Sequence, residues 1–269
     1  MNNDILAQID SLPPLPQTVI HIEEFKNKED KSPPELALII SKDPLILSTL
    51  LKVSNSAMFG FKKKIETPQM AVSLLGVNFT ISLAIGSAIK NLIETSLEPY
   101  GADSDKFLET ASQAIIMASR WASEIDIGLR DRLLLPTFLL ETGKFIIARI
   151  IKEQGLSDEF YAEVKESVDI ASVEQKYLGT STSIITAAIF EKWGLSETLV
   201  NDIRYVDEPN HPENKSLVVS QIIHVVNKVC NIVHPFKEEA IASAIEYAAS
   251  ASLKPEELER IIADMKEKQ

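Results

Sequence analysis

The side chains that could carry out chemistry are few in this sequence. Histidine, the commonest side-chain ligand of catalytic metals, occurs at His21, His211, His224 and His234. Two ligands on one helix face must be three or four residues apart, and no pair of these histidines has that spacing. The histidine pattern therefore predicts no metal site.

The sequence also lacks the residue patterns that nucleophilic catalysis and phosphate binding require. The single cysteine, Cys230, lies in an apolar helical pattern with Lys228 as its nearby basic residue, which favours a buried core thiol. Neither a Gly-x-Ser-x-Gly motif nor a glycine-rich phosphate loop is present. We therefore predict a protein that is not an enzyme and binds no cofactor.

Composition and charge narrow the choice of partners. The net charge is −12, and 45% of the 269 residues are hydrophobic, which is typical of a globular protein. An acidic surface repels phosphate backbones and anionic lipids, so nucleic acid and membrane are not expected partners. The N-terminus lacks a signal-peptide pattern, and no apolar run reaches the roughly 20 residues that span a bilayer. We expect a cytoplasmic protein.

The elements that must position any site are helices. Apolar residues recur at spacings of three and four, and hairpin dipeptides are absent. Helix starts are predicted at a capping box beginning at Ser32, at Asp43-Pro44, at Thr67-Pro68 and at a second capping box beginning at Ser172. The predicted helices span 33–41, 44–54, 68–75, 78–95, 105–124, 130–153 with a bend at Pro136, 158–166, 173–177, 183–193, 197–206, 213–233, 237–249 and 255–269.

The predicted fold class is all-α, an irregular globule of many helices. A loop-like stretch from Leu97 to Ser104 divides the helical patterns into two groups. We place a subdomain boundary there, within one domain that covers 1–269. Residues 1–99 form an N-terminal helical subdomain, which packs on a second helical subdomain formed by 100–269.

Ordered motifs give the chain a resemblance to a known family. The first half contains Leu12-Pro-Pro-Leu-Pro16, Ile40-Ser-Lys-Asp-Pro44, Asn55-Ser-Ala57, and Ala71 with Leu75-Gly76. The second half contains Glu174 with Leu178-Gly179, Glu191-Lys-Trp-Gly-Leu195 and Asp202-Ile-Arg-Tyr205. Each motif is weak alone, but their order and spacing over nearly the whole chain resemble the HDOD family, whose name stands for HD-related output domain.

The resemblance implies a fold related to the HD phosphohydrolases, which hold metal ions with histidines and a His-Asp pair. It also implies where those ligands would lie in this chain. The corresponding positions are Ala111, the pair Glu141-Thr142, Thr182 and the pair Val206-Asp207. Two carboxylates without imidazole would compete poorly with water for a metal. The second subdomain is thus expected to be a degenerate HD-like unit without a metal.

The family resemblance implies a bacterial signal-transduction or regulatory module that is a pseudoenzyme. We expect it to bind protein partners; binding of a small ligand in a residual cleft is the second choice. Homo-oligomer formation stays open. One alternative is a divergent metal-dependent phosphohydrolase acting on nucleotides or cyclic dinucleotides, and another is a purely structural subunit. The residues that we predict to contact a partner or ligand are Pro13, Pro14, Pro16, Asn55, Ser56, Glu141 and Tyr205. For the prolines and Asn55, a purely structural role is the competing interpretation.

Overall fold

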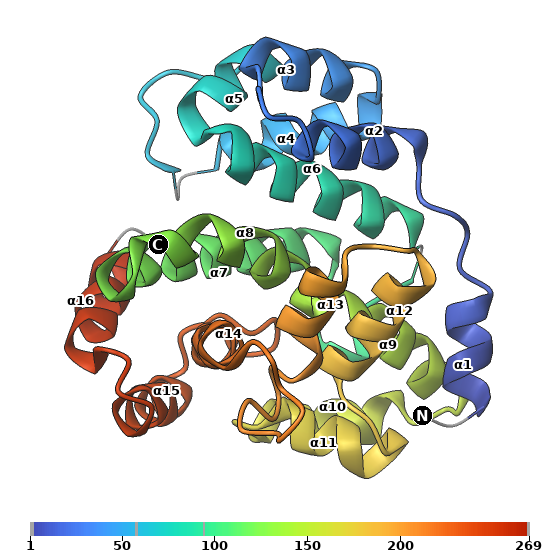
Figure 1. Ribbon diagram of the computed structural model, residues 1–269. Helices are drawn as coiled ribbons and strands as arrows, with labels where there is room; N and C mark the ends of the chain where they lie inside the picture. The colour runs from blue at the N-terminus through green and yellow to red at the C-terminus, as the bar shows by residue number, and fades with distance from the viewer. Residues whose placement is uncertain (1–2, 57–58, 94, 268–269) are drawn as a thin grey trace. The chain divides into compact units, whose positions relative to one another are not determined.

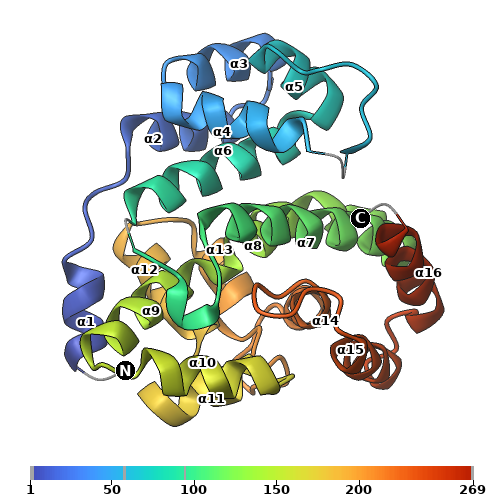
Figure 2. The same cartoon turned by 180° about the vertical axis from the view of Figure 1, so that it is seen from behind.

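The computed structural model describes residues 3–56, 59–93 and 95–267, and within these ranges it contains helices and no strand (Figures 1 and 2). The predicted all-α class is confirmed. None of the described helices is both long enough and apolar enough to cross a membrane. The chain divides into two compact units, which are described separately below.

The smaller unit contains the described residues from 13 to 93. Its helices are α2 (Gln17–Lys26), α3 (Pro33–Ser41), α4 (Pro44–Ser54), α5 (Pro68–Leu75) and α6 (Val77–Leu92). Helix α6 packs against all four of the others. Fully buried apolar side chains from α2, α3 and α4 form the core, among them Ile22, Phe25, Leu36, Ile40 and Leu50.

Local capping explains where several of these helices begin. The Asp43 carboxylate accepts hydrogen bonds from the first amides of α4, and the Thr67 hydroxyl accepts one from the Met70 amide in α5, as predicted. The capping box predicted at Ser32 is wrong, because the Ser32 side chain makes no capping hydrogen bond to α3. Its partner Glu35 instead forms an ion pair with Lys28.

The larger unit contains residues 3–12 and 95–266. Its long helix α7 (Ser104–Ile125) packs against α8, α14 and α16. The other helices of this unit are α1 (Asn3–Asp10), α8 (Arg130–Leu139), α9 (Gly143–Glu153), α10 (Ser157–Glu166), α11 (Ile170–Leu178), α12 (Thr182–Lys192), α13 (Glu197–Arg204), α14 (Leu217–Val229), α15 (Glu238–Ser250) and α16 (Pro255–Lys266). Single-turn 3-10 helices are η2 (Glu98–Tyr100), η3 (Ile127–Leu129) and η4 (Leu140–Thr142).

Helix α1 belongs to the larger unit, whereas the sequence analysis placed all of 1–99 in one N-terminal subdomain. It packs against α9 and α12 (Figure 1). The Gln8 side chain donates to the Glu153 carboxylate at 3.1 Å and accepts from Arg149 at 3.1 Å. These contacts cross more than 140 residues of chain, a distance over which local sequence patterns give no signal.

Several helix boundaries in the larger unit differ from the prediction; α14, for example, is Leu217–Val229 where a helix over 213–233 was predicted. Helix α11 begins earlier than expected because Asp169, not Ser172, is its N-cap, and the Asp169 carboxylate accepts from the Ser172 amide at 3.1 Å. The helix predicted over 130–153 is interrupted at η4, four residues beyond the bend expected at Pro136. The cause of this interruption lies in another helix, α12.

Candidate functional site

The break between α8 and α9 is held open by a threonine from α12. The Thr186 hydroxyl donates to the Leu140 carbonyl at 2.7 Å and accepts from the Gly143 amide at 2.8 Å. It therefore satisfies two backbone groups that a continuous helix would pair internally. This arrangement turns the η4 residues and the start of α9 toward α11 and α12.

The α9 backbone approaches α12 so closely at Gly143 that a side chain has no room. A Cβ atom at this position would lie 2.5 Å from the Thr182 carbonyl oxygen and 2.8 Å from the Thr186 hydroxyl. Glycine alone permits this approach. As a result, Lys144, which directly follows Gly143, contacts Thr182 at the start of α12, and Glu141, two residues before Gly143, lies beside Lys144.

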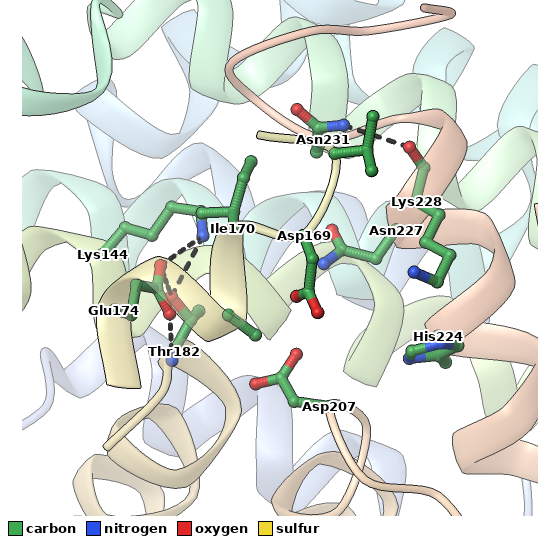
Figure 3. A pocket seen from close by; sticks show the side chains of 12 residues that line it. Lys144, Asp169, Ile170, Glu174, Thr182, Asp207, His224, Asn227, Lys228 and Asn231 are labelled. Carbon is green, nitrogen blue, oxygen red and sulfur yellow. Dashed lines mark hydrogen bonds and ion pairs between the residues drawn. The ribbon is translucent and has the colours of Figure 1, made fainter. Parts of the chain in front are cut away.

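Lys144 is the centre of a buried polar cluster and is only 2% exposed. Its Nζ atom lies 2.8 Å from Glu174 Oε1, 3.0 Å from Thr182 Oγ1 and 3.4 Å from Glu141 Oε1. The same ammonium lies 4.9 Å from the centre of the Tyr100 ring. We call Lys144, Glu141, Glu174, Thr182 and Tyr100 the Lys144 cluster; Figure 3 shows the contacts of Lys144 with Glu174 and Thr182.

Electrostatics keep this buried lysine charged. Burial by itself lowers the pKa of Lys144, but the carboxylates of Glu141 and Glu174 outweigh burial and raise the pKa above its ordinary value. A buried ammonium is tolerable only when it is paired and hydrogen-bonded, and both conditions are met here. Lys144 is therefore a fixed positive charge inside the larger unit.

Glu174 is the anion that binds Lys144 most closely, and its side chain is fully buried. It accepts hydrogen bonds from the Thr182 amide at 2.6 Å, the Thr182 hydroxyl at 2.7 Å and the Tyr100 hydroxyl at 2.9 Å. Burial, followed by the charge of Glu174, raises the pKa of Tyr100, so the phenol keeps its proton and donates it. Four donors, including Lys144, thus converge on one carboxylate.

Glu141 differs from Glu174 because neither of its carboxylate oxygens has a hydrogen-bond partner. Glu141 is 6% exposed, and within the cluster its negative charge is balanced by the positive charge of Lys144. Burial raises the pKa of Glu141, while Lys144 acts in the opposite direction. Asp207 is a third carboxylate that acts electrostatically on Lys144, and it is held by the Ser183 amide at 3.1 Å.

A small cavity of about 70 Å³ adjoins the Lys144 cluster (Figure 3). It is lined on one side by Asp169, Glu174 and Asp207 and on the other by residues of α14, including His224 and Lys228. Pockets for small organic ligands have volumes of about 300–1,000 Å³, whereas one water needs only about 10–15 Å³ of such space. The cavity can therefore contain a few waters or a small ion, and it is too small to enclose a nucleotide.

The structure brings together three of the six positions at which the family resemblance implied metal ligands: Glu141, Thr182 and Asp207. Glu141 and Thr182 belong to the Lys144 cluster and Asp207 acts on it electrostatically, whereas the other three positions take no part in it. Ala111 is a buried residue of α7, the Thr142 hydroxyl is buried without a hydrogen-bond partner, and Val206 contributes only its carbonyl oxygen, which bonds His224. Sequence analysis gave no site role to Lys144, Glu174 or Tyr100. One sequence feature could have pointed to a role for Lys144, because it is the only charged residue over 142–148.

The donor set around this cluster does not fit a catalytic metal. The place between Glu141 and Glu174 is taken by the Lys144 ammonium, and no imidazole belongs to the cluster. Among the residues that the structure describes, no group of three or more His, Cys, Asp or Glu side chains could hold a metal ion. Cys230 is buried, and burial raises the pKa of its thiol, as expected for a core cysteine.

His224 gives the larger unit a pH dependence. Its Nδ1 atom bonds the Val206 carbonyl oxygen at 2.8 Å. Burial, followed by the charge of Lys228, lowers its pKa below the ordinary value of 6.5. The unfolded chain therefore binds a proton at this histidine before the folded chain does, and the stability present above pH 6.5 is lost as the pH falls toward the folded-state pKa.

We expect this loss to disappear in His224→Gln, which keeps a donor for Val206 but cannot titrate. Urea unfolding of both proteins between pH 7.5 and 5.5 checks this expectation. The wild type should lose stability relative to the variant, with a slope of at most about 1.4 kcal/mol per pH unit for one proton. Equal slopes would contradict the assignment of this pH dependence to His224.

Asn55 and Ser56, two of the predicted contact residues, lie in the smaller unit, outside the Lys144 cluster. The Asn55 amide donates to the carbonyls of Leu51 and Ile65, at 2.7 and 2.8 Å, and accepts from the Ile65 amide at 2.7 Å. Asn55 thus joins the end of α4 to a loop of the smaller unit. The Ser56 hydroxyl is buried without a hydrogen-bond partner, and Ala57 of the same motif lies outside the described residues. A partner contact at Asn55 or Ser56 stays a prediction.

The prolines and Tyr205 lie at or near the surface. Pro13 and Pro14 are exposed, and Pro16 is the extended residue that precedes α2. Tyr205 is half-buried; its ring stacks on His211 with 4.6 Å between ring centres, and its hydroxyl donates to Glu213 at 3.1 Å. Of these residues, Pro13 and Pro14 are the most accessible to another protein.

The chain is similar to known proteins in both sequence and fold. The sequence pattern of the HDOD domain matches residues 12–209. A crystal structure of an HDOD domain protein of unknown function from Geobacter sulfurreducens matches with a TM-score of 0.69 and 14% identity, over 97% of this chain and 91% of that chain. A virulence factor from Campylobacter jejuni matches with a TM-score of 0.57 and 22% identity, over the full length of both chains.

A longer relative is an uncharacterized protein of Treponema pallidum. It is 23% identical over 224 residues, which are 81% of this chain but only 42% of that protein. The chain thus spans less than half the length of this curated relative. At these identities the solved structures establish a shared fold and no shared activity.

Proposed function

This chain belongs to the HDOD domain family, and from that membership and the geometry of the Lys144 cluster we propose that it is a non-catalytic module of signal transduction that acts by binding other proteins. The observation that carries the proposal is the buried Lys144 ammonium, which is bound between Glu141 and Glu174. Hydrolysis of a phosphodiester by HD chemistry needs a metal-bound water. The resemblance implies metal ligands at Glu141, Thr182 and Asp207, and the Lys144 ammonium lies beside these residues. A lysine side chain supplies no such water.

The size of the adjoining cavity supports proteins over small organic molecules as partners. With about 70 Å³, the cavity cannot bury a nucleotide or a cyclic dinucleotide. This cavity is therefore not the place where such a ligand binds, and we propose that a partner protein contacts exposed residues. The exposed Pro13 and Pro14 are the leading candidates, because extended proline segments dock into aromatic grooves of partner proteins with little loss of conformational entropy.

Metal content and turnover separate this proposal from the phosphohydrolase alternative. We expect untagged, full-length protein to contain far less than one equivalent of iron, manganese or zinc. We also expect its rate of hydrolysis of bis-p-nitrophenyl phosphate and cyclic dinucleotides in added Mn²⁺ to equal that of buffer. Stoichiometric metal together with turnover that a chelator abolishes would sink the proposal and establish the alternative.

Affinity capture of the endogenous protein tests the binding surface. We expect a specific partner to be captured by the wild type and lost when Pro13 and Pro14 are both replaced by alanine. The matched control is Pro212→Ala, which removes an exposed proline from a loop of the larger unit and should leave capture unchanged. Equal capture by all three proteins would exclude residues 13 and 14 as the contact. A complex that is stoichiometric under every growth condition would favour a purely structural subunit.

A further inference from the structure

The charges of this chain are unevenly distributed. Residues 44–93, which include α4, α5 and α6, contain five lysines but a single acidic residue, Glu66. Their net charge is therefore +4, while that of the whole chain is −12. Charges act mainly within a Debye length, which is about 8 Å at physiological ionic strength. A basic region can thus attract an anionic surface even though the chain as a whole is acidic.

Three of these lysines, Lys62, Lys63 and Lys64, are consecutive and exposed. None of them forms an ion pair or a side-chain hydrogen bond with another residue in the part of the chain that the structure describes. They follow Phe59 and Phe61 in the segment between α4 and α5. In both views this segment lies at the edge of the smaller unit, outside its helices (Figures 1 and 2). We call residues 59–64 the basic loop.

The two phenylalanines of the basic loop form an apolar patch beside the lysines. Gly60 between them has a φ of +61°, a left-handed conformation that favours glycine. The rings of Phe59 and Phe61 are parallel within 2°, with 5.9 Å between their centres. Phe79 of α6 packs edge to face with Phe59, with 5.6 Å between ring centres. All three rings are half-buried, so each keeps some apolar surface exposed.

Asn55 fixes the base of the basic loop. Its amide donates to the Ile65 carbonyl at 2.8 Å and accepts from the Ile65 amide at 2.7 Å, and the Ile65 side chain is only 1% exposed. The residue directly after the three lysines is thus anchored to the end of α4. A loop that is held at its base loses less conformational entropy on binding than a free segment does.

We propose that the basic loop is a site of peripheral membrane contact, which binds the surface of a bilayer that contains anionic phospholipids. The three lysines lie against the phosphate-bearing headgroups, and Phe59 and Phe61 enter the boundary between headgroups and acyl chains. Basic and aromatic side chains are the residues with which peripheral proteins bind at this depth. The proposal goes beyond the proposed function and does not depend on it.

The expected contact is weak and reversible. Each basic residue near an anionic membrane surface raises binding about fivefold, so three lysines contribute on the order of 100-fold. Stable anchoring takes more than one such signal, and the apolar rings add a second signal to the charge. The bound fraction should therefore depend on both the lipid concentration and the salt concentration.

Single-stranded nucleic acid and an acidic protein segment are other anionic partners that three lysines could attract. Bases bind by stacking on free aromatic faces, and in the basic loop Phe59 and Phe61 cover one face of each other. Insertion into a bilayer interface requires only exposed apolar area, which both rings have. Carboxylates of a protein segment account for the lysines but not for the pair of rings. The combination of the two features favours the bilayer.

Sedimentation of the full-length protein with vesicles tests the proposal. The vesicles consist of phosphatidylcholine alone or with about 40% phosphatidylglycerol, which gives a negative surface potential. We expect binding only to the anionic vesicles at about 0.1 M salt, and its loss at about 1 M salt, because the Debye length falls from about 10 Å to about 3 Å. Replacing Lys62, Lys63 and Lys64 together by glutamine should lower the partition coefficient on the order of 100-fold.

The matched control changes the net charge by the same amount in the larger unit. Three exposed lysines are replaced by glutamine there, namely Lys152, Lys176 and Lys215. This control variant should bind the anionic vesicles as the wild type does, because its substitutions lie outside the basic loop.

Phe61→Trp reports whether a ring enters the bilayer. Its fluorescence is taken as the difference from that of the wild type, which has two tryptophans. We expect the emission to shift to shorter wavelength with anionic vesicles and to be quenched by lipids that are brominated on their acyl chains. A contact made by the lysines alone would leave this difference spectrum unchanged.

Four results would overturn the proposal. The first is that the wild type does not sediment with anionic vesicles. The second is equal binding by the lysine variant and the control variant. The third is an unchanged difference spectrum of Phe61→Trp. The fourth is tighter binding of single-stranded DNA or polyglutamate than of anionic vesicles. None of these results involves turnover or the contacts of Pro13 and Pro14, so failure here is distinguishable from failure of the proposed function.

Discussion

Replacing Glu174 by leucine should lower the free energy of unfolding of the larger unit by about 3–5 kcal/mol, the range for removing one partner of a buried ion pair. The substitution leaves Lys144 without its closest anion and leaves the donors of Tyr100 and Thr182 without their acceptor. Urea unfolding followed by tryptophan fluorescence measures this loss. Both tryptophans, Trp121 and Trp193, belong to the larger unit, so the signal reports on that unit.

Glu163→Gln is the matched control, since Glu163 is a half-exposed glutamate whose ion pair is with the exposed Lys176, and the glutamine side chain keeps an oxygen that can accept from the Tyr177 hydroxyl. Exposed ion pairs contribute little, so its unfolding midpoint should equal that of the wild type within error. Combining Glu174→Leu with Lys144→Met should cost less than the sum of the two single changes, with a coupling free energy of about 0.5–3 kcal/mol. A Glu174→Leu midpoint equal to that of the control would show that the cluster contributes nothing to stability.

Gly143→Ala should lower the free energy of unfolding by about 1–3 kcal/mol, the usual range for adding a methyl group where no space exists. The new Cβ would lie 2.5 Å from the Thr182 carbonyl oxygen, which is backbone and cannot rotate away. Helices α9 and α12 must therefore separate. The same unfolding experiment measures the effect.

Gly128→Ala is the control for Gly143→Ala. A Cβ at position 128 has the Asp126 carboxylate as its nearest neighbour, at 3.2 Å, and this side chain can move. Its effect on stability should be within about 1 kcal/mol, because alanine also reduces the entropy of the unfolded chain. If Gly143→Ala is no more destabilising than Gly128→Ala, the close approach of α9 to α12 is not needed for folding.

The helices of this protein were largely predictable because helix formation depends on interactions within about four residues. Apolar spacing and the caps at Asp43 and Thr67 located most segments correctly. The predictions missed α1 and α2, for which no helix was expected. Other errors arose where side chains make contacts that the sequence pattern did not indicate. The Asp169 carboxylate caps α11 in place of Ser172, and Thr186 interrupts the helix predicted over 130–153.

The sequence by itself determined the all-α class and the absence of histidines from the positions where the resemblance implies metal ligands. Both are properties of residue type and order. Only the tertiary structure decided which side chains meet beside these positions: Lys144 and Glu174 are 30 residues apart and meet through the packing of α9, α11 and α12. Their charges interact strongly because burial removes water, and burial is a property of the whole fold that no local pattern contains.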